Sequence, residues 1–141
     1  MFQVQPVRSR EAQAALAGLV GCPYFEDTYA FSAVDLTDDA SAVTAVIGLC
    51  QFTYAPEEAV IRSIKAAPGS EDDEAMIVML RAVTAFLNRA EIPFVYAEEG
   101  SADPAFLTKL GFRPLAGGRL GIDLAKFYRS PHQYMKDEGN G

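Results

Sequence analysis

The fold is decided by residues 59–97, AVIRSIKAAPGSEDDEAMIVMLRAVTAFLNRAEIPFVYA. Residues 59–66 are rich in Val and Ile, which favours a strand. Hydrophobic side chains then recur with a helical period of about 3.6 residues over Ser70–Ala90. Residues 93–97 form an unbroken apolar run, which is typical of a strand covered on both faces. A strand, a helix and a second strand in this order make a crossover, so the two strands are expected to be parallel neighbours.

The segments on either side complete a mixed sheet. Strands expected at 29–36 and 42–54 are joined to strand 59–66 by short turns, which makes an antiparallel meander. The other predicted elements are a strand at 2–7, a helix at 10–20, a short helix at 105–110 after Asp103-Pro104, and a final hairpin of 112–115 with 119–124. The order β-α-β-β-β-α-β-α-β-β predicts an α/β (α+β) chain with a mixed sheet.

Four consecutive carboxylates, Glu71 to Glu74, stand at the start of the long helix. Ser70 is the expected N-cap, with Asp73 at the N3 position of a capping box. Acidic residues in a first turn complement the helix dipole, so the bland interpretation of this cluster is a helix start and not a metal site. The following residues, Ala75–Leu80, are apolar on every side, which predicts burial on more than one side or a self-association face. A homodimer is therefore one partner hypothesis.

Composition bounds the class of protein. The 141 residues fit one domain, expected over 1–135, with a flexible tail at 136–141. A net charge of -7 without a basic cluster argues against nucleic acid and anionic membranes. Cys22 and Cys50 are far apart and predict free thiols, not a disulfide framework or a zinc site. No signal peptide and no membrane-spanning run is visible, so we expect a cytoplasmic protein.

Three short segments resemble the GNAT acyltransferase superfamily. They are Ile64-Lys65-Ala66-Ala67-Pro68 at a strand end, Met79-Leu80-Arg81-Ala82-Val83 in the helix body, and Lys109-Leu110-Gly111-Phe112 after the short helix. The resemblance implies the GNAT fold and acyl transfer from acetyl-CoA or another acyl-CoA to a small amine. It also implies that a bound thioester would lie along Ile64, Ala66 and Ser70.

The same resemblance marks departures from the family's pattern. The family has an Arg-Gly-x-Gly-x-Gly loop at a helix N-terminus, and the backbone N–H groups of that loop bind the pyrophosphate of CoA. The corresponding residues here are Glu71-Asp72-Asp73-Glu74-Ala75-Met76. Carboxylates at that position repel phosphate. The family's catalytic tyrosine corresponds to Leu107, which has no proton to give, and its asparagine near the end of strand five corresponds to Gly100.

Glu98 and Glu99 are the candidate catalytic residues. They follow strand 93–97 at its carboxyl end, where ligands bind in open α/β sheets, and either could act as general base toward an amine. The alternative is a solvated pair at a strand terminus. His132, the only histidine, is interpreted as a surface residue of the tail.

Three hypotheses about function follow. The first is an N-acyltransferase acting on a small amine. The second is a non-catalytic GNAT-like module that binds a small molecule or a protein. The third is an unrelated α+β fold with the same element order.

Overall fold

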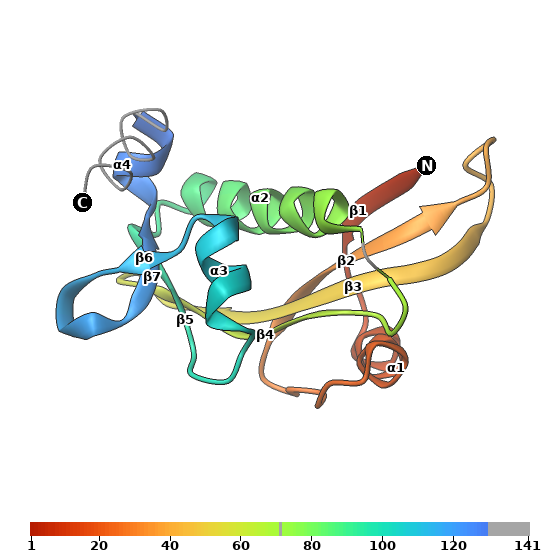
Figure 1. The fold of residues 1–141 in the computed structure, drawn as a ribbon, viewed down its shortest axis with the longest axis horizontal. Helices are drawn as coiled ribbons and strands as arrows, with labels where there is room; N and C mark the ends of the chain where they lie inside the picture. Colours follow the sequence, from red (N-terminus) through yellow and green to blue (C-terminus); the bar gives the residue numbers. More distant parts are fainter. Residues whose placement is uncertain (71, 130–141) are drawn as a thin grey trace.

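A seven-stranded sheet in the order β1-β2-β3-β4-β5-β7-β6 runs through the computed structural model, which describes residues 1–70 and 72–129 (Figure 1). The strands are β1 Phe2–Pro6, β2 Tyr29–Leu36, β3 Val43–Tyr54, β4 Ala59–Ala66, β5 Phe94–Ala97, β6 Arg113–Pro114 and β7 Leu120–Asp123. The helices are α1 Arg10–Val20, α2 Asp73–Arg89, α3 Pro104–Leu110 and α4 Leu124–Arg129, with a single 3-10 turn, η1, at Ala116–Gly118.

Strand directions confirm the mixed sheet. The strands β1 to β4 pair antiparallel as a meander. The crossover through α2 brings β5 beside β4 in parallel, with Ala59 opposite Val95 and Ile61 opposite Ala97. The strand β7 then pairs antiparallel with β5. The α/β class, the element order and the parallel pair predicted from residues 59–97 are all present.

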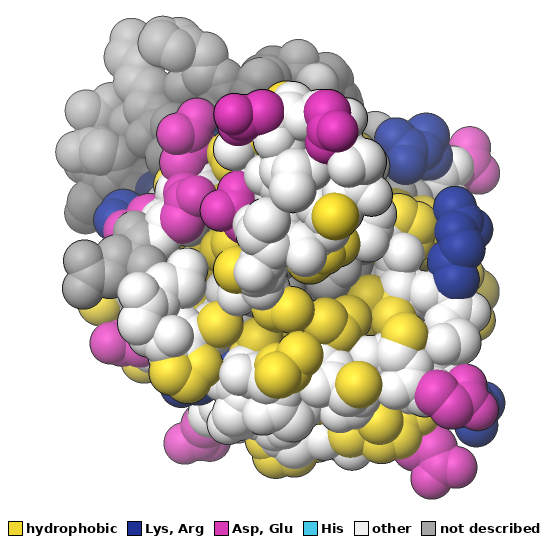
Figure 2. Space-filling model, turned by 90° about the vertical axis from the view of Figure 1, so that its right-hand side faces the viewer, with side chains coloured by type: hydrophobic (Ala, Val, Ile, Leu, Met, Phe, Trp, Pro, Cys, Tyr) yellow, Lys and Arg dark blue, Asp and Glu magenta, His cyan; other side chains and the backbone are white. Residues whose placement is uncertain are grey.

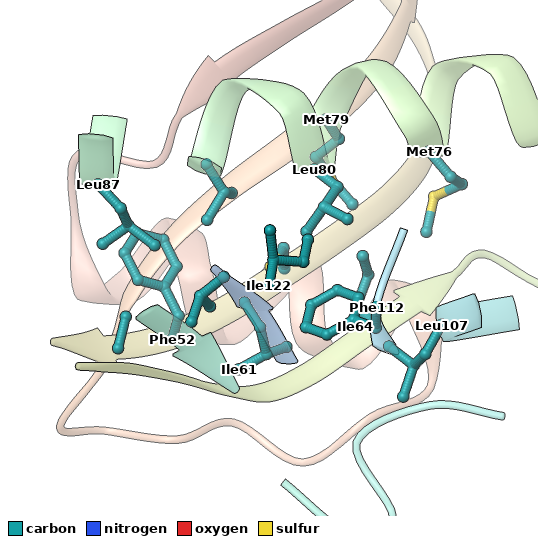
Figure 3. Close-up of a cluster of buried hydrophobic side chains, with 14 of the residues drawn as sticks. Phe52, Ile61, Ile64, Met76, Met79, Leu80, Leu87, Leu107, Phe112 and Ile122 are labelled. Carbon is teal, nitrogen blue, oxygen red and sulfur yellow. The ribbon is translucent and has the colours of Figure 1, made fainter. Parts of the chain in front are cut away.

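The two longer helices cover opposite faces of the sheet. In Figure 1, α2 lies above the strands and α1 lies below them. Under α2, side chains from the sheet and from α2 and α3 form one apolar cluster (Figure 3). Its largest fully buried members include Phe52, Ile61, Met79, Leu87 and Phe112. Burial of such side chains is worth about 1.5–3 kcal/mol each, so this cluster is the main source of stability.

The start of α2 differs from the sequence prediction. The N-cap is Asp72 and not Ser70: the Asp72 carboxylate accepts the N–H of Ala75 at 3.0 Å, and the helix begins at Asp73. Ser70 instead donates its N–H to the carbonyl of Ala67 at 3.0 Å, which closes a turn. That turn prevents helical backbone from starting at Ser70, and aspartate is as good an N-cap as serine. The carboxylates at 73 and 74 still lie in the first turn, as expected.

The C-terminal part also needs correction. The predicted hairpin is reduced to the two-residue strand β6 and the four-residue strand β7, joined through η1. Helix α4 follows β7 directly and was missed, because its six residues are too few to show a hydrophobic period. His132 and the predicted tail at 136–141 lie outside the described residues.

The apolar start of α2 is used by the chain's own core. Ala75, Met76, Met79 and Leu80 are buried, while Ile77 and Val78 remain partly exposed. The homodimer thus stays a prediction, and most of the surface that suggested it is covered within the chain. Among residues 1–70 and 72–129, no helix has the length and apolar character needed to cross a membrane.

Candidate functional site

The parallel strands β4 and β5 separate toward their carboxyl ends. Their last regular contact is the N–H of Glu98 donated to the carbonyl of Ile61 at 2.9 Å. The pairing of β3 with β4 skips Arg62, so this residue forms a bulge that turns the later part of β4 away from β5. The gap is then bridged by one hydrogen bond, from the N–H of Ile64 to the carbonyl of Ser101 at 3.0 Å.

Two clefts flank this bridge. The first, called here the α2 cleft, has a volume of about 520 Å³, and its lining includes Ser63, Ile64, Asp72, Ser101 and Asp103. The second, called here the α3 cleft, has a volume of about 750 Å³, and its lining includes Val60, Glu98, Glu99, Leu107 and Arg119. Gly100 and Ala102 line both clefts, so the connection between β5 and α3 is the wall between them.

The sequence-predicted residues divide between these clefts. Ile64, Ala66 and Ser70 all line the α2 cleft, whereas Glu98 and Glu99 line the α3 cleft. The structure brings the three predicted cofactor contacts together and places the two predicted bases on the other side of the wall. Their roles stay predictions.

The α2 cleft is acidic. Asp72, Asp73 and Asp103 line it together with one lysine, Lys65. Asp73 also forms an ion pair with Lys109 of α3, with Nζ and Oδ2 2.5 Å apart. Figure 2 shows the end of the molecule that carries the β2–β3 turn and the start of α2: carboxylates gather in its upper part, and hydrophobic side chains form a patch below them.

Side-chain caps engage backbone donors at the two helix starts beside the α2 cleft. Asp72 receives the N–H of Ala75 at its side chain and the N–H of Met76 at its carbonyl, the latter at 3.2 Å. The Asp103 carboxylate accepts the N–H of Ala105 at 2.9 Å at the start of α3. Each helix start therefore carries its own anion, and that carboxylate takes one of the N–H groups that an external phosphate would otherwise use.

A CoA pyrophosphate does not fit this arrangement of residues. Phosphate oxygens need N–H donors and positive charge, and they would meet Asp72 and Asp73 instead. Met76, which stands where the family has its third glycine, is only 2% exposed and fills the space beneath the start of α2. The N–H of Ile64 on the β4 edge is taken by Ser101.

Serine hydroxyls contribute to the lining of the same cleft. Ser101 is 6% exposed, and its Oγ is buried with no hydrogen-bond partner among the described residues. Ser63, from β4, is equally buried and also lines the cleft. Sequence reasoning did not single out either residue. The sequence did carry a signal for Ser63, because this polar residue interrupts the Val- and Ile-rich run of β4. It carried none for Ser101, which lies in a connection that is polar throughout.

A buried amide network holds one wall of the cleft in place. Gln51, fully buried in β3, accepts hydrogen bonds from Gln13 Nε2 at 2.8 Å and from the N–H of Phe25 at 3.0 Å. Its own Nε2 donates to the carbonyl of Pro23 at 2.8 Å. Cys22 and Pro23 line the α2 cleft, so the network ties the connection after α1 to the sheet. In the sequence, this network is indicated by Gln51, a polar amide between the apolar residues Cys50 and Phe52 of a predicted strand.

Glu98 is not a free base. Its Oε2 accepts Nε–H of Arg62 at 2.8 Å, and Arg62 also lies 3.6 Å from Asp27 and over the ring of Phe25. Glu99 has no ion pair among the described residues and lines the α3 cleft. Leu107, where the family has its tyrosine, is 2% exposed and packs in the core under α2. No group of three or more His, Cys, Asp or Glu side chains in residues 1–70 and 72–129 is arranged to hold a metal.

The sheet order, the parallel pair of β4 and β5 that opens at its carboxyl end, and the long helix beside it define the fold of the GNAT N-acetyltransferases. Three solved structures illustrate the likeness. The ribosomal-protein alanine N-acetyltransferase of Escherichia coli superposes with a TM-score of 0.60 at 13% identity, covering 86% of this chain and 89% of that one. The spermidine/spermine N-acetyltransferase SpeG of Vibrio cholerae superposes with a TM-score of 0.61 at 13% identity, covering 91% of this chain and 95% of that one.

The PaiA N-acetyltransferase of Thermoplasma acidophilum, solved in complex with coenzyme A, gives a TM-score of 0.60 at 12% identity, covering 86% and 96%. At these identities the likeness establishes the fold alone. It rules out the third hypothesis, an unrelated fold with the same element order. No protein-family model and no curated protein matches the sequence.

Proposed function

We propose that this chain is an acyltransferase-like protein of the GNAT fold whose α2 cleft binds a small molecule other than CoA. One observation carries the proposal: the starts of α2 and α3, where an anion would be held, are capped by the chain's own Asp72 and Asp103. A helix N-terminus that already holds a carboxylate gains little from a second anion and repels it.

The position of the cleft supports a binding role. It lies beside the opening of a parallel strand pair, which is where open α/β sheets place their ligands. Its volume of about 520 Å³ is within the range of small-molecule sites. The buried network around Gln51 keeps its wall preorganised, and preorganised walls lower the entropy cost of binding.

A second candidate function is acyl transfer from an acyl-CoA to a small amine. The fold and the opening between β4 and β5 favour it, as does the CoA complex of the PaiA enzyme. In this case Glu99 is the better base of the two predicted carboxylates, because Glu98 is held by Arg62. The Ile64–Ser101 hydrogen bond would have to open before a thioester could pair with the β4 edge.

A thermal-shift screen with CoA, acetyl-CoA and a longer acyl-CoA separates the two functions. A ligand at about 100 times its Kd stabilises the folded state by about 2.7 kcal/mol, which is easily seen in a melting curve. We expect no shift for the native chain. We expect a shift for a Glu71→Arg, Asp72→Gly, Glu74→Gly variant, because the repaired start of α2 has an arginine and fewer carboxylates. Met76 is left in place because it belongs to the core.

The matched control changes Asp38→Gly, Glu57→Arg and Glu91→Gly, three exposed carboxylates that line neither cleft, and so makes the same change in net charge. If this control gains CoA binding equally, general charge and not the α2 start is responsible. Stabilisation of the native chain by acyl-CoA, together with acyl transfer to an amine, would overturn the proposal in favour of the second function.

A further inference from the structure

The two edges of the seven-stranded sheet differ in how well they resist pairing with another chain. The β6 edge is only two residues long and contains Pro114, which has no N–H to offer. The β1 edge runs over Phe2–Pro6, carries no charged side chain, and keeps a continuous register with β2. Edges that stay unpaired are usually protected by charges or bulges, so β1 lacks the protection that would keep a partner strand away.

The hydrogen bonds of β1 show which backbone groups point away from β2. Leu36 donates its N–H to the carbonyl of Met1 at 2.8 Å, and Val7 donates its N–H to the carbonyl of Ala30 at 2.9 Å. Hydrogen-bonded positions alternate in an antiparallel pair, so the odd-numbered residues of this register bond to β2. Among residues 1–70 and 72–129, β1 pairs with β2 alone. The outward backbone groups therefore belong to the even-numbered residues, Phe2, Val4 and Pro6.

Helix α2 packs against β1 and β2, and its flank on that side is apolar. Thr84 marks the flank toward α4, because its hydroxyl forms a hydrogen bond with that of Tyr128 at 2.9 Å. On the opposite flank the ring of Phe86 lies 6.0 Å from the ring of Phe31 in β2. Residues four apart share one side of a helix. The members of this second flank are apolar and partly exposed: Val78, Ala82 and Phe86.

We infer that two copies of this chain pair through their β1 strands, antiparallel and with Val4 on the twofold axis, into one continuous sheet. A twofold pair that overlaps the whole of β1 must centre on Val4, which sets Phe2 opposite Pro6 and Gln3 opposite Gln5 of the second copy. Apolar residues then meet on the α2 side of the sheet, amides meet on the other side, and no like charges are opposed. This surface is separate from the α2 cleft, so the inference does not rest on the proposed function.

The backbone groups and the apolar surface both suit a second copy. In this register the two Val4 residues exchange N–H and carbonyl bonds, and each Phe2 N–H meets a Pro6 carbonyl. Only the Phe2 carbonyl lacks a donor, because Pro6 has no N–H. Phe2 and Val4 pack against the core under α2 and are still partly exposed, so pairing would cover the rest of their surface. It would also bring the apolar flank of α2 beside its copy.

The mass of the native chain in solution tests the pairing. Sedimentation equilibrium is measured from about 1 µM to about 1 mM. We expect the mass to rise from 15.2 kDa to twice that value. The midpoint should fall on the order of 10–100 µM, the range of a small and weak interface.

Two charge variants test the register at the same two positions. Gln3→Lys with Gln5→Lys opposes like charges on both sides of the twofold axis, so we expect a dimer about tenfold weaker at low salt and partly restored by salt. This weakening would run against the general charge effect, because two lysines reduce the net charge of -7. The matched control, Gln3→Lys with Gln5→Glu, opposes lysine and glutamate and should dimerise at least as well as the native chain.

Disulfide trapping gives a second reading of the register. In a Cys22→Ser background, Gln3→Cys and Gln5→Cys are oxidised alone and as an equal mixture. The mixture should cross-link several times faster than either variant alone. The reason is that these two positions form a non-hydrogen-bonded pair, whose Cα atoms lie about 4.5 Å apart, within reach of a disulfide.

Each contrary result overturns the inference. A native chain that stays a monomer at about 1 mM would mean that the β1 edge belongs to a different partner or to none. Equal effects of the two charge variants, or no preference for the mixed disulfide, would place the contact in another register or on another surface. A mass well above two copies would mean an open assembly and not a twofold pair. None of these results decides whether the α2 cleft binds CoA.

Discussion

The side chain of Met76 lies directly against Gly48, so that a Cβ atom added to this glycine would clash with the methionine sulfur. The same Cβ would lie 3.1 Å from the carbonyl of Lys65. Gly48 belongs to β3 and Met76 to the start of α2, and this contact lets the helix approach the sheet closely. The residue that replaces the family's third glycine is thus paired with a glycine across the core.

Gly48→Ala should lower the free energy of unfolding by about 1–3 kcal/mol, the usual cost of overpacking a close contact. Met76→Ala should cost about 2–5 kcal/mol through the cavity that it leaves. The double variant should cost less than the sum, because the new Cβ partly fills that cavity. Urea denaturation of all four proteins measures the coupling, and simple additivity would show that the two side chains do not share space.

Gln51→Leu should destabilise the fold by about 1–3 kcal/mol, because it removes the hydrogen-bond partner of the Phe25 N–H and of the Pro23 carbonyl. It also removes one of the bonds of Gln13 Nε2, which keeps its bond to Thr28 Oγ1 at 2.7 Å. Loosening of the connection after α1 should also speed alkylation of Cys22. The exposed Gln3→Leu on β1 is the matched control and should change neither the urea midpoint nor the alkylation rate. A Gln51 variant as stable as the control would contradict a structural role for the network.

Asp72→Ala should reduce stability by about 1 kcal/mol through loss of the α2 cap, whereas Ser70→Ala should change it little. The reason is that Asp72, and not Ser70, accepts the N–H of Ala75. Thermal melts at low and high salt separate the two effects of Asp72→Ala on stability. Salt screens the repulsion between carboxylates, whereas the destabilisation from the lost cap hydrogen bond remains at high salt. If Ser70→Ala lowered stability more than Asp72→Ala, Ser70 and not Asp72 would be the N-cap of α2.

The turn between β2 and β3 should respond to acid through Asp39. Its Oδ1 accepts hydrogen bonds from the hydroxyls of Ser41 and Thr37, both at 2.7 Å, and from the N–H of Ser41. These bonds lower the pKa of Asp39 from 3.8 to about 2. Because the folded pKa is the lower one, the stabilisation is complete above pH 3.8 and is lost as the pH falls toward 2.

An NMR titration that follows the Asp39 carboxyl carbon and the Ser41 amide tests this pH dependence. Both signals should move with a midpoint near pH 2. In Asp39→Asn the Ser41 amide should show no such transition. A midpoint at the ordinary value for aspartate would mean that the turn does not hold the carboxylate as described.

The two thiols should react very differently. Cys50 is fully buried in β3, and burial raises the pKa of its thiol, so it should resist alkylation until the protein unfolds. Cys22 is partly exposed in the α2 cleft and should react in the native state. Mass spectrometry after iodoacetamide should find one modified thiol without denaturant and two in concentrated urea. Modification of Cys50 in the native chain would indicate that β3 opens readily.

Much of the fold could be predicted from residues 59–97, because alternation, helical period and an unbroken apolar run are local properties of the chain. The predicted meander and crossover match the observed pairings. The errors lie where the local signal is short: the cap of α2, the reduced strand β6 and the six residues of α4. At those points neighbouring turns and packing decide the backbone, and neither is visible in a single segment.

The candidate site was predictable only in part. The positions of Ile64, Ala66 and Ser70 beside one cleft follow from the crossover, since they stand at the end of β4 and the approach to α2. The separation of Glu98 and Glu99 from that cleft does not, because it depends on the Ile64–Ser101 hydrogen bond across the strand opening.

The sequence by itself determined the α/β class, the parallel strand pair and the negative charge at the start of α2, because periodicity and charge are properties of consecutive residues. Tertiary structure alone decided which groups share the α2 cleft. It placed Asp103, the cap of α3, and Asp72, the cap of α2, in the lining of one cleft, and it buried the Ser101 hydroxyl without a partner among the described residues. The physical reason is that a cleft is formed by long-range packing, which joins residues that no local pattern connects.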